Sequence, residues 1–327
     1  MKAVFLAIFM SAATFTSLVM SPAHAQSSGD RPLSVVIPFA PGGGTDVLAR
    51  MTMPKIAEKL GTVAVIENRS GAAGAIGAQF TARAAPDGKT LMVGSVSEIG
   101  INPSIYPKLP YNVDRDFVAV TALAAAPMVL VVSPTSSVQT AGDLVSQAKA
   151  NPGKINFGSA GTGSGAHMAA ELFIYATQIK LTHVPYKGTG AVAADMLGSQ
   201  KDMIMFAPLP SIAGLVRGGQ LKAVAVTGKQ RSPAMPDVPT FVESGISGFD
   251  MDYWYGLVAP AGTPADVRNK IHQAALEVFS QPETVANLSK QGLVPTITTE
   301  ADFAAFVKTD MNKWAQVVKS ANIKADD

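Results

Sequence analysis

LSVVIPFAPGGGTD, at residues 33–46, is the stretch that decides the fold. Its first five residues are mostly apolar and predict a buried β-strand. Three glycines follow, and Thr45 or Asp46 is expected to cap a helix that extends to about Leu60. A strand that passes through a short loop into a helix is the repeating unit of an α/β fold with a largely parallel sheet.

The same alternation continues along the chain in two series. In the first, strands are predicted at 62–67 and 90–94, and a helix opens at 71–74. In the second, the predicted strands are 128–132, 155–158, 180–183, 203–206 and 222–226, with helices at 141–150 and 165–177. A last strand at 255–259 precedes helices at 264–279, 282–291 and 301–320.

No Gly/Ser-rich linker separates the two series, which predicts two lobes joined by more than one crossing of the chain. The final helices are expected to return to the first lobe. We therefore assign residues 26–127 and 253–327 to lobe 1 and residues 128–252 to lobe 2.

The composition excludes several classes of protein. The 327 residues suffice for about two domains, and 47% hydrophobic against 15% charged residues excludes wholesale disorder. A net charge of +2 argues against nucleic-acid binding. The chain has no cysteine, and its four histidines form no HExxH pattern, so neither a metal site nor a cofactor is predicted.

The N-terminus has the pattern of a secretory signal peptide. Lys2 precedes a short apolar run, and Ala23-His24-Ala25 forms a cleavage pattern of small residues, which predicts cleavage after Ala25. The alternative, a membrane anchor, is disfavoured because serines and threonines interrupt the run. We expect residues 1–25 to be removed and the mature protein to be exported.

The glycine loop after the first strand is a candidate anion site. Glycine permits close approach of the backbone to a ligand, and the first N–H groups of a helix lie at the positive end of its dipole. No Lys-Ser/Thr pair follows the glycines, so the loop is not a P-loop. The alternative is a tight turn in which Asp46 serves as a cap and loop organiser.

A second such loop, GSAGTGSGAH, occupies residues 158–167. The dinucleotide fingerprint is disfavoured because the next predicted strand ends without an acidic residue, and Ser164 lacks the flanking glycines of a nucleophile elbow. A second anion-binding helix start fits better, with the hydroxyl groups of Ser159, Thr162 and Ser164 as extra donors. His167 is assigned a structural role in the loop, since no catalytic partner accompanies it.

Two further segments complete the candidate site. VPYKGTG at 184–190 is another backbone-donor loop, in which Lys187 is assigned mainly to solvent. The aromatic run Tyr253-Trp254-Tyr255 either floors a pocket between the lobes or packs in the core.

These loops together resemble one family, the substrate-binding receptors of tripartite tricarboxylate transporters, also called the Bug family. The resemblance covers essentially the whole mature chain. The segments that carry it are PFAPGGGTD (38–46), ENRSGAAG (67–74), AAPDGKTL (84–91), INPSIY (101–106), GSAG with His167 (158–167), VPYKG (184–188) and WYGLVAPAGTP (254–264).

The resemblance implies a two-lobed periplasmic binding protein of type II-like α/β architecture, which closes on a small organic acid and delivers it to membrane permease subunits. It also implies a receptor rather than an enzyme, expected to be a monomer, that holds the ligand carboxylate through backbone N–H groups and waters. The ligand-binding residues expected are Phe39, Ala40, Gly43, Gly44, Thr45, Asp46, Ser95, Ser159, Gly161, Thr162, Ser164, His167, Lys187, Gly188, Thr189, Ala207 and Tyr253.

Two other functions remain open from the sequence. A periplasmic hydrolase of carboxylate esters would need an assembled nucleophile and base, and a sensor would pass the closed state to a signalling partner. Ser97-Glu98 departs from the family pattern, and a carboxylate at Glu98 would oppose an anionic ligand if it pointed inward.

Overall fold

The predicted first strand, β1 (Leu33–Ile37), lies between β2 (Ala64–Asn68) and β3 (Thr90–Ser95) and pairs with both in parallel. The computed structural model describes residues 31–198, 202–249, 251–320 and 323, and residues 32–327 cluster as one compact unit. The predicted signal peptide and its cleavage site lie outside the described residues.

The strands form one sheet in the order β2-β1-β3-β9-β4-β7-β5-β6, and β8 and β10 both pair with β4. The remaining strands are β4 (Phe117–Val132), β5 (Asn156–Ser159), β6 (Thr182–Pro185), β7 (Ile204–Pro208), β8 (Lys222–Val226), β9 (Asp252–Pro260) and β10 (Val294–Pro295). The outer ladders β5–β6 and β5–β7 are parallel, like those of β1, whereas every ladder of β4 and β9 is antiparallel. The sheet is therefore mixed, and the prediction of a largely parallel sheet holds only for the outer ladders, because β4 and β9 run antiparallel to their neighbours.

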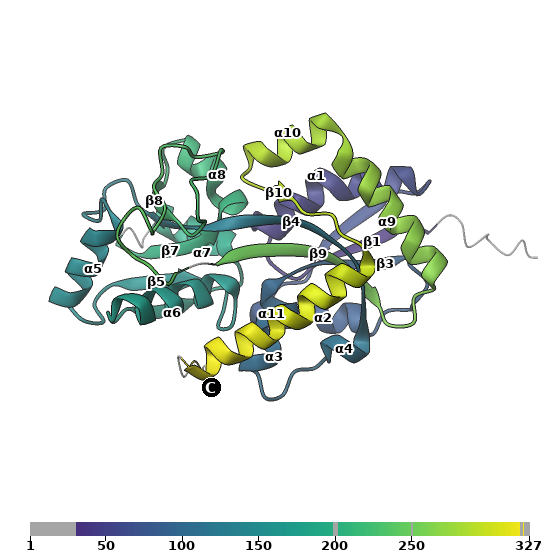
Figure 1. Cartoon of the computed structure of the whole chain (residues 1–327), viewed down its shortest axis with the longest axis horizontal. Coiled ribbons are helices and arrows are strands. Elements are labelled where there is room, and N and C mark those ends of the chain that lie inside the picture. Colours follow the sequence, from purple (N-terminus) through teal and green to yellow (C-terminus); the bar gives the residue numbers. More distant parts are fainter. Residues whose placement is uncertain (1–30, 199–201, 250, 321–322, 324–327) are drawn as a thin grey trace, which may run out of the picture. The chain divides into compact units, whose positions relative to one another are not determined.

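Strands β4 and β9 hold the two halves of the sheet together. In Figure 1 they run side by side across the middle, with β1–β3 toward one end and β5–β8 toward the other. The first part of β4 pairs with β9 as far as Pro127, opposite Asp252, and its last part pairs with β7 and β8. We call β1, β2, β3, β9 and β10 the first half of the sheet, and β5, β6, β7 and β8 the second half.

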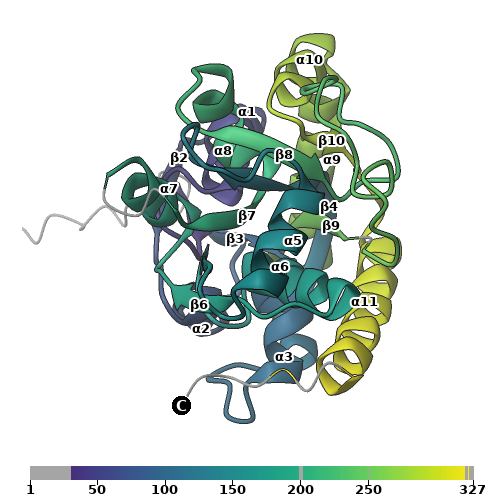
Figure 2. The ribbon, with the colours of Figure 1, turned by 90° about the vertical axis from the view of Figure 1, so that its left-hand side faces the viewer.

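Helices cover both halves. α6 and α8 both contact β7, and Figure 2 shows them on opposite sides of it. The helices are α1 (Gly44–Lys59), α2 (Ala75–Ala82), α3 (Asn102–Ile105), α4 (Val113–Asp116), α5 (Ala141–Ala150), α6 (Gly165–Thr177), α7 (Thr189–Leu197), α8 (Leu209–Arg217), α9 (Ala265–Ser280), α10 (Pro282–Lys290) and α11 (Glu300–Ser320), with a 3-10 turn at Ala72–Gly74 and a π-helical turn at Val96–Ile101.

The core consists of a large apolar cluster that continues through both halves and a smaller one between β7, β8, α7 and α8. The larger cluster includes β1, β3, β9 and the Phe173–Phe206–Phe241–Phe249 group. Within the described ranges, no helix is both long and apolar enough to cross a membrane, and no group of His, Asp and Glu is arranged to hold a metal ion.

Candidate functional site

Three strand-to-helix loops, the end of β7 and strand β9 meet around a small cavity of about 20 Å³. The loops precede α1, α6 and α7, so three helix N-termini lie at or beside this cavity. The residues that line it are Phe39, Gly43, Gly44, Thr45, Ala160, Ser164, Ala166, Thr189, Pro208 and Tyr253. None of these side chains is charged.

In the first loop the helix begins two or three residues earlier than the sequence predicted, since the expected cap was Thr45 or Asp46. Its N-cap is Gly43, in extended conformation, and no side chain caps it. Neither Thr45 nor Asp46 is the N-cap residue, because both already lie in the first turn. Gly42, with φ of +82°, is the residue of this loop that needs the left-handed conformation.

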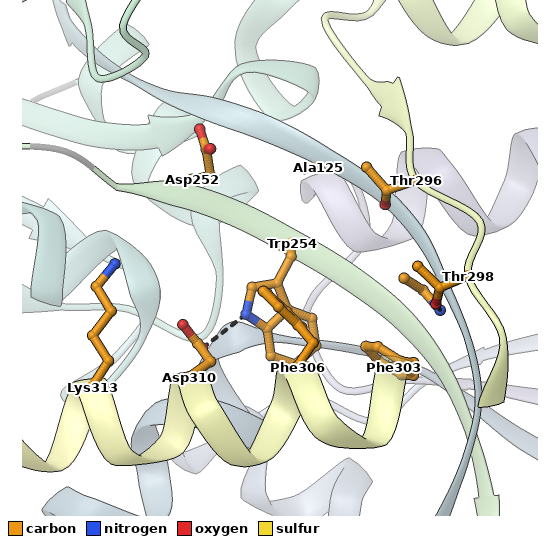
Figure 3. Close-up of a pocket in the computed structure, with 10 residues that line it drawn as sticks. Ala125, Asp252, Trp254, Thr296, Thr298, Phe303, Phe306, Asp310 and Lys313 are labelled. Atoms are coloured by element: carbon orange, nitrogen blue, oxygen red, sulfur yellow. Dashed lines mark hydrogen bonds between the residues drawn. The ribbon is translucent and has the colours of Figure 1, made fainter. Parts of the chain in front are cut away.

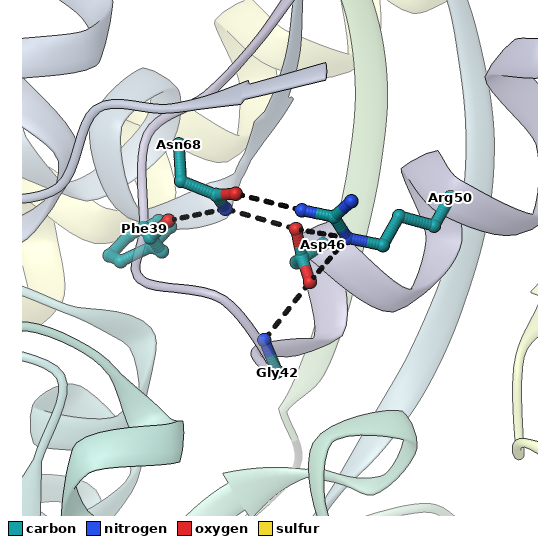
Figure 4. Close-up of polar contacts among 5 residues, drawn as sticks. All are labelled: Phe39, Gly42, Asp46, Arg50 and Asn68. Atoms are coloured by element: carbon teal, nitrogen blue, oxygen red, sulfur yellow. Dashed lines mark hydrogen bonds and ion pairs between the residues drawn. The ribbon is translucent and has the colours of Figure 1, made fainter.

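Asp46 instead ties the loop together, as Figure 4 shows. Its carboxylate accepts hydrogen bonds from the Gly42 N–H (3.0 Å), from Arg50 Nε (2.9 Å) and from Asn68 Nδ2 (3.0 Å). Asn68 Nδ2 also donates to the Phe39 carbonyl at 2.9 Å. Burial alone would raise the pKa of Asp46, but these hydrogen bonds outweigh it and hold that pKa below its usual value. Asp46 is thus an ionised loop organiser, but its predicted role as the helix cap is wrong, because it lies in the first turn.

The second loop uses two glycines and a serine cap. Gly161 and Gly163 have φ of +112° and +82°, and the Ser164 hydroxyl accepts from the His167 N–H. The N–H of Gly165 donates to Ser97 Oγ at 3.0 Å, and the Tyr106 hydroxyl donates to the Thr162 carbonyl at 2.5 Å. The loop before α6 is therefore bonded directly to the turn that follows β3 and to the residue that follows α3.

Two stacked histidines, His167 and His183, support this loop. Gly163 N–H donates to His167 Nδ1 at 3.3 Å, and the His167 ring stacks on His183 with centroids 4.2 Å apart. The Ser159 hydroxyl lies 2.6 Å from His183 Nε2 and is fully buried. His167 thus bonds to the backbone of its own loop, and the hydroxyl of Ser159 faces His183.

The third loop packs against the first. A Cβ on Gly188 would lie 2.9 Å from Ala40 Cβ, and one on Gly190 would lie 2.7 Å from the Pro41 carbonyl oxygen. Lys187 is exposed and does not line the cavity. The first and third loops therefore approach each other closely beside the cavity.

Tyr253 forms one wall, and a buried carboxyl lies behind it. The Tyr253 hydroxyl lies 2.9 Å from Ser95 Oγ and 3.0 Å from Ser97 Oγ. Ser95 Oγ in turn donates to Glu98 Oε2 at 2.8 Å, and the Ser95 N–H donates to Glu98 Oε1. Burial raises the pKa of Glu98 to about 8. Glu98 is therefore mostly protonated at neutral pH, and it does not line the cavity.

Tyr255 explains why Gly44 is a glycine. Its side chain is fully buried, and its hydroxyl makes no hydrogen bond with any residue that the structure describes. A Cβ on Gly44 would overlap that hydroxyl and come within 3.1 Å of Pro210. Gly44 is thus required by sterics, since its φ is an ordinary helical one.

Seven of the predicted binding residues line the cavity, namely Phe39, Gly43, Gly44, Thr45, Ser164, Thr189 and Tyr253. The others lie around it: Ala40, Asp46, Ser95, Ser159, Gly161, Thr162, His167, Lys187, Gly188 and Ala207. Sequence reasoning missed Ala160, Ala166 and Pro208. Only Pro208 carried a signal, because a proline at the end of a predicted strand often opens a helix.

This arrangement can bind an anion without a salt bridge. The first N–H groups of a helix have no partner inside it and carry the positive end of its dipole, worth roughly 0.3–1 kcal/mol per charge at each terminus. Ser164, Thr45, Thr189 and Tyr253 add hydroxyl groups. The walls of Phe39, Pro208 and alanines would suit a short apolar carbon chain.

The sequence of the chain is similar to those of known proteins. The family model described as "Tripartite tricarboxylate transporter family receptor" matches residues 48–323. Protein BugT of Bordetella pertussis is 33% identical over 313 residues, which are 94% of this chain and 95% of BugT.

Two solved structures are similar over nearly their whole length. The periplasmic binding protein BugD has a TM-score of 0.86 at 31% identity, covering 90% of this chain and 99% of BugD. MatC (Rpa3494) from Rhodopseudomonas palustris, solved with bound malate, has a TM-score of 0.84 at 32% identity, covering 88% of this chain and 99% of MatC. The predicted fold class, a periplasmic binding protein of α/β type, is confirmed.

Proposed function

Because the chain belongs to the family of tripartite tricarboxylate transporter receptors, we propose that it is a periplasmic protein that captures a small organic acid and delivers it to the permease subunits of such a transporter. Its relatives are receptors and binding proteins, and the chain is accordingly a receptor rather than an enzyme. The observation that carries the proposal is the meeting of three helix N-termini around one cavity without a charged lining residue.

The charges around the cavity are compatible with an anionic ligand. Asp46 is ionised, but Arg50 and Asn68 satisfy its carboxylate. Glu98 is held in its neutral form by burial. The departure of Ser97-Glu98 from the family pattern therefore adds no repulsion at neutral pH. Malate, which was bound in the structure of MatC, is the dicarboxylate for the first test.

The ligand is proposed to enter by separation of two lobes, residues 26–127 with 253–327 and residues 128–252. A cavity of about 20 Å³ holds little more than one water molecule. The contacts of Gly188 with Ala40 and of Tyr106 with Thr162 join the two proposed lobes across the cavity. Opening would break these contacts while β4 and β9 stay paired.

A comparison of acids with their methyl esters tests the ligand class. A thermal-shift screen of mono-, di- and tricarboxylates, including malate and benzene carboxylates, would first find a ligand. Calorimetry should then show that esterifying one carboxylate weakens binding at least about tenfold, since a charge-assisted hydrogen bond contributes roughly 1.5–3 kcal/mol. Equal affinity for acid and ester would refute an anion site.

A pair of variants tests backbone recognition. Gly43 lines the cavity, and the nearest atom to a Cβ there is the Ala40 carbonyl oxygen at 3.5 Å, so the fold has room for a side chain. Gly43→Val should therefore fold normally and lose most binding, whereas Lys187→Ala should retain it. The reverse ranking would mean that a salt bridge carries recognition.

The proposed function also includes export of the protein, its permease partner and its state of assembly. The mature protein should begin at Gln26, which intact-mass measurement of the periplasmic fraction would check. It is proposed to be a monomer in solution and to engage the permease in its closed, liganded state. Deleting the permease genes should abolish uptake of the ligand while leaving its binding to the purified protein unchanged.

A further inference from the structure

A second cavity, of about 370 Å³, lies on the opposite face of β9 from the carboxylate site. Successive residues of a strand point to opposite faces of the sheet: Tyr253 lines the small cavity and Trp254 the large one. Its volume falls in the range of small-molecule sites, roughly 300–1,000 Å³. Figure 3 shows it between α11 and strands β4 and β9, with Thr296 and Thr298 along its far edge.

Three aromatic side chains line one end of this cavity. The ring of Trp254 meets those of Phe303 and Phe306 edge to face, with centroids 5.7 and 5.6 Å apart. Trp254 and Phe303 are buried, whereas Phe306 is 44% exposed. A large aromatic side chain left exposed beside two buried ones gives a surface on which a flat apolar group can stack.

The other end carries carboxylates. Trp254 Nε1 and Trp314 Nε1 both donate to Asp310 Oδ2, at 2.9 and 3.1 Å. These two bonds fix the Asp310 carboxylate and leave its Oδ1 without a hydrogen bond to any residue in the described ranges. Asp252 also lines the cavity, and Lys313 is the one cation among its lining residues, so their formal charges sum to −1.

We propose that this cavity binds an organic cation, an amine attached to a flat apolar group, independently of the carboxylate site. The ammonium group would lie at Asp310 Oδ1, and the apolar group would stack on Phe306 and Trp254. A cation beside aromatic faces is favoured by their quadrupoles, and a hydrogen bond to a carboxylate strengthens it further.

The two tryptophans of the chain give a direct readout, because both indole N–H groups donate to Asp310. In ¹⁵N-labelled mature protein, benzylamine should shift both indole signals in a saturable manner, with or without malate present. Benzyl alcohol, which has the same shape without the charge, should bind at least about tenfold more weakly. Equal shifts with the two compounds, or none with benzylamine, would overturn the proposal.

Variants locate the site. Phe306→Ala and Asp310→Asn should each weaken benzylamine binding about tenfold or more, whereas Asp114→Asn, at an exposed carboxylate outside the cavity, should not change it. Lys313→Ala should strengthen binding, because it removes a like charge. Weaker benzylamine binding in Lys313→Ala would contradict recognition of the positive charge in this cavity. Should Asp310→Asn fail to fold, Phe306→Ala and Lys313→Ala decide the matter.

Discussion

Glu98 has no exposed surface. Its carboxyl group accepts a hydrogen bond from the Ser95 hydroxyl, which also contacts the Tyr253 hydroxyl. The pKa of Glu98, about 8, lies above the ordinary value of 4.5, so the folded state binds a proton that the unfolded state releases between those values. The free energy of unfolding should therefore fall as pH rises through this window. Glu98→Gln keeps the shape and stays neutral. Urea unfolding should show the variant gaining roughly 2–4 kcal/mol on wild type between about pH 5 and about pH 9.

The control for this measurement is Glu58→Gln, at an exposed glutamate of α1. It should leave the pH dependence unchanged. A constant difference between Glu98→Gln and wild type across the range would show that Glu98 is ionised in the folded protein.

At Gly44 the steric argument leads to a prediction about two residues. Gly44→Ala should reduce the free energy of unfolding by roughly 1–3 kcal/mol, because the new methyl group overlaps the Tyr255 hydroxyl. Tyr255→Phe should restore much of this loss, since it removes that hydroxyl, which makes no hydrogen bond among the described residues. Gly43→Ala, with space around it, is the matched control. A simple sum of the two single effects in the double variant would argue against the contact.

At the scale of elements, the start of α1 depends on Asp46. Asp46→Asn should lower the free energy of unfolding by roughly 1.5–3 kcal/mol at neutral pH, because it removes charge-assisted bonds from Arg50 and Gly42. The pKa of Asp46 is depressed in the folded state, so this stabilisation exists above the unfolded pKa and is lost as pH falls through the folded one. Unfolding measured at about pH 7 and about pH 3 should show the difference shrink in acid. A deficit of equal size at both values would mean that Asp46 acts only through its shape.

The elements also show what the sequence could predict. Helices α5 and α6 and strand β8 have the bounds predicted, because caps and apolar runs mark both ends. Strand β4 is predicted only from Met128, yet it begins at Phe117. The middle of β4 is rich in alanine and ends at Pro127, and both residue types disfavour strands. Pairing with β9 overrides this preference. Helix α8 was missed because its short segment lies between two clear strands.

The candidate site was predictable to the extent that it depends on local loops. Glycines after a strand mark the helix starts, and those starts meet around one cavity. Which atoms face that cavity depends on contacts distant in sequence, such as that of Ser159 with His183. Whether Glu98 is charged could not be predicted from the sequence, because its pKa depends on its burial in the folded protein.

At the scale of the whole molecule, the proposed opening should respond to one hydrogen bond between the two proposed lobes. Tyr106→Phe removes the bond to the Thr162 carbonyl, which joins the two proposed lobes, and Tyr106 does not line the cavity. Ligand affinity should fall about three- to tenfold, because one hydrogen bond contributes roughly 0.5–1.5 kcal/mol to the closed state. Small-angle scattering should show compaction on ligand addition for wild type and a smaller response at equal ligand concentration for the variant. Tyr175→Phe, at an exposed tyrosine of α6, is the control. An unchanged profile at saturation would exclude the hinge.

Pro127 and Asp252 are partners in the ladder of β4 and β9, so the segment between them, which contains β5, β6, β7 and β8, begins and ends at neighbouring points. The two ends of this segment are adjacent in space, an arrangement that tolerates the insertion and exchange of domains. A chimera would need only two junctions, both on strands whose pairing is backbone to backbone. Relatives with different ligands could thus have diversified by replacing one side of the binding site while keeping the other.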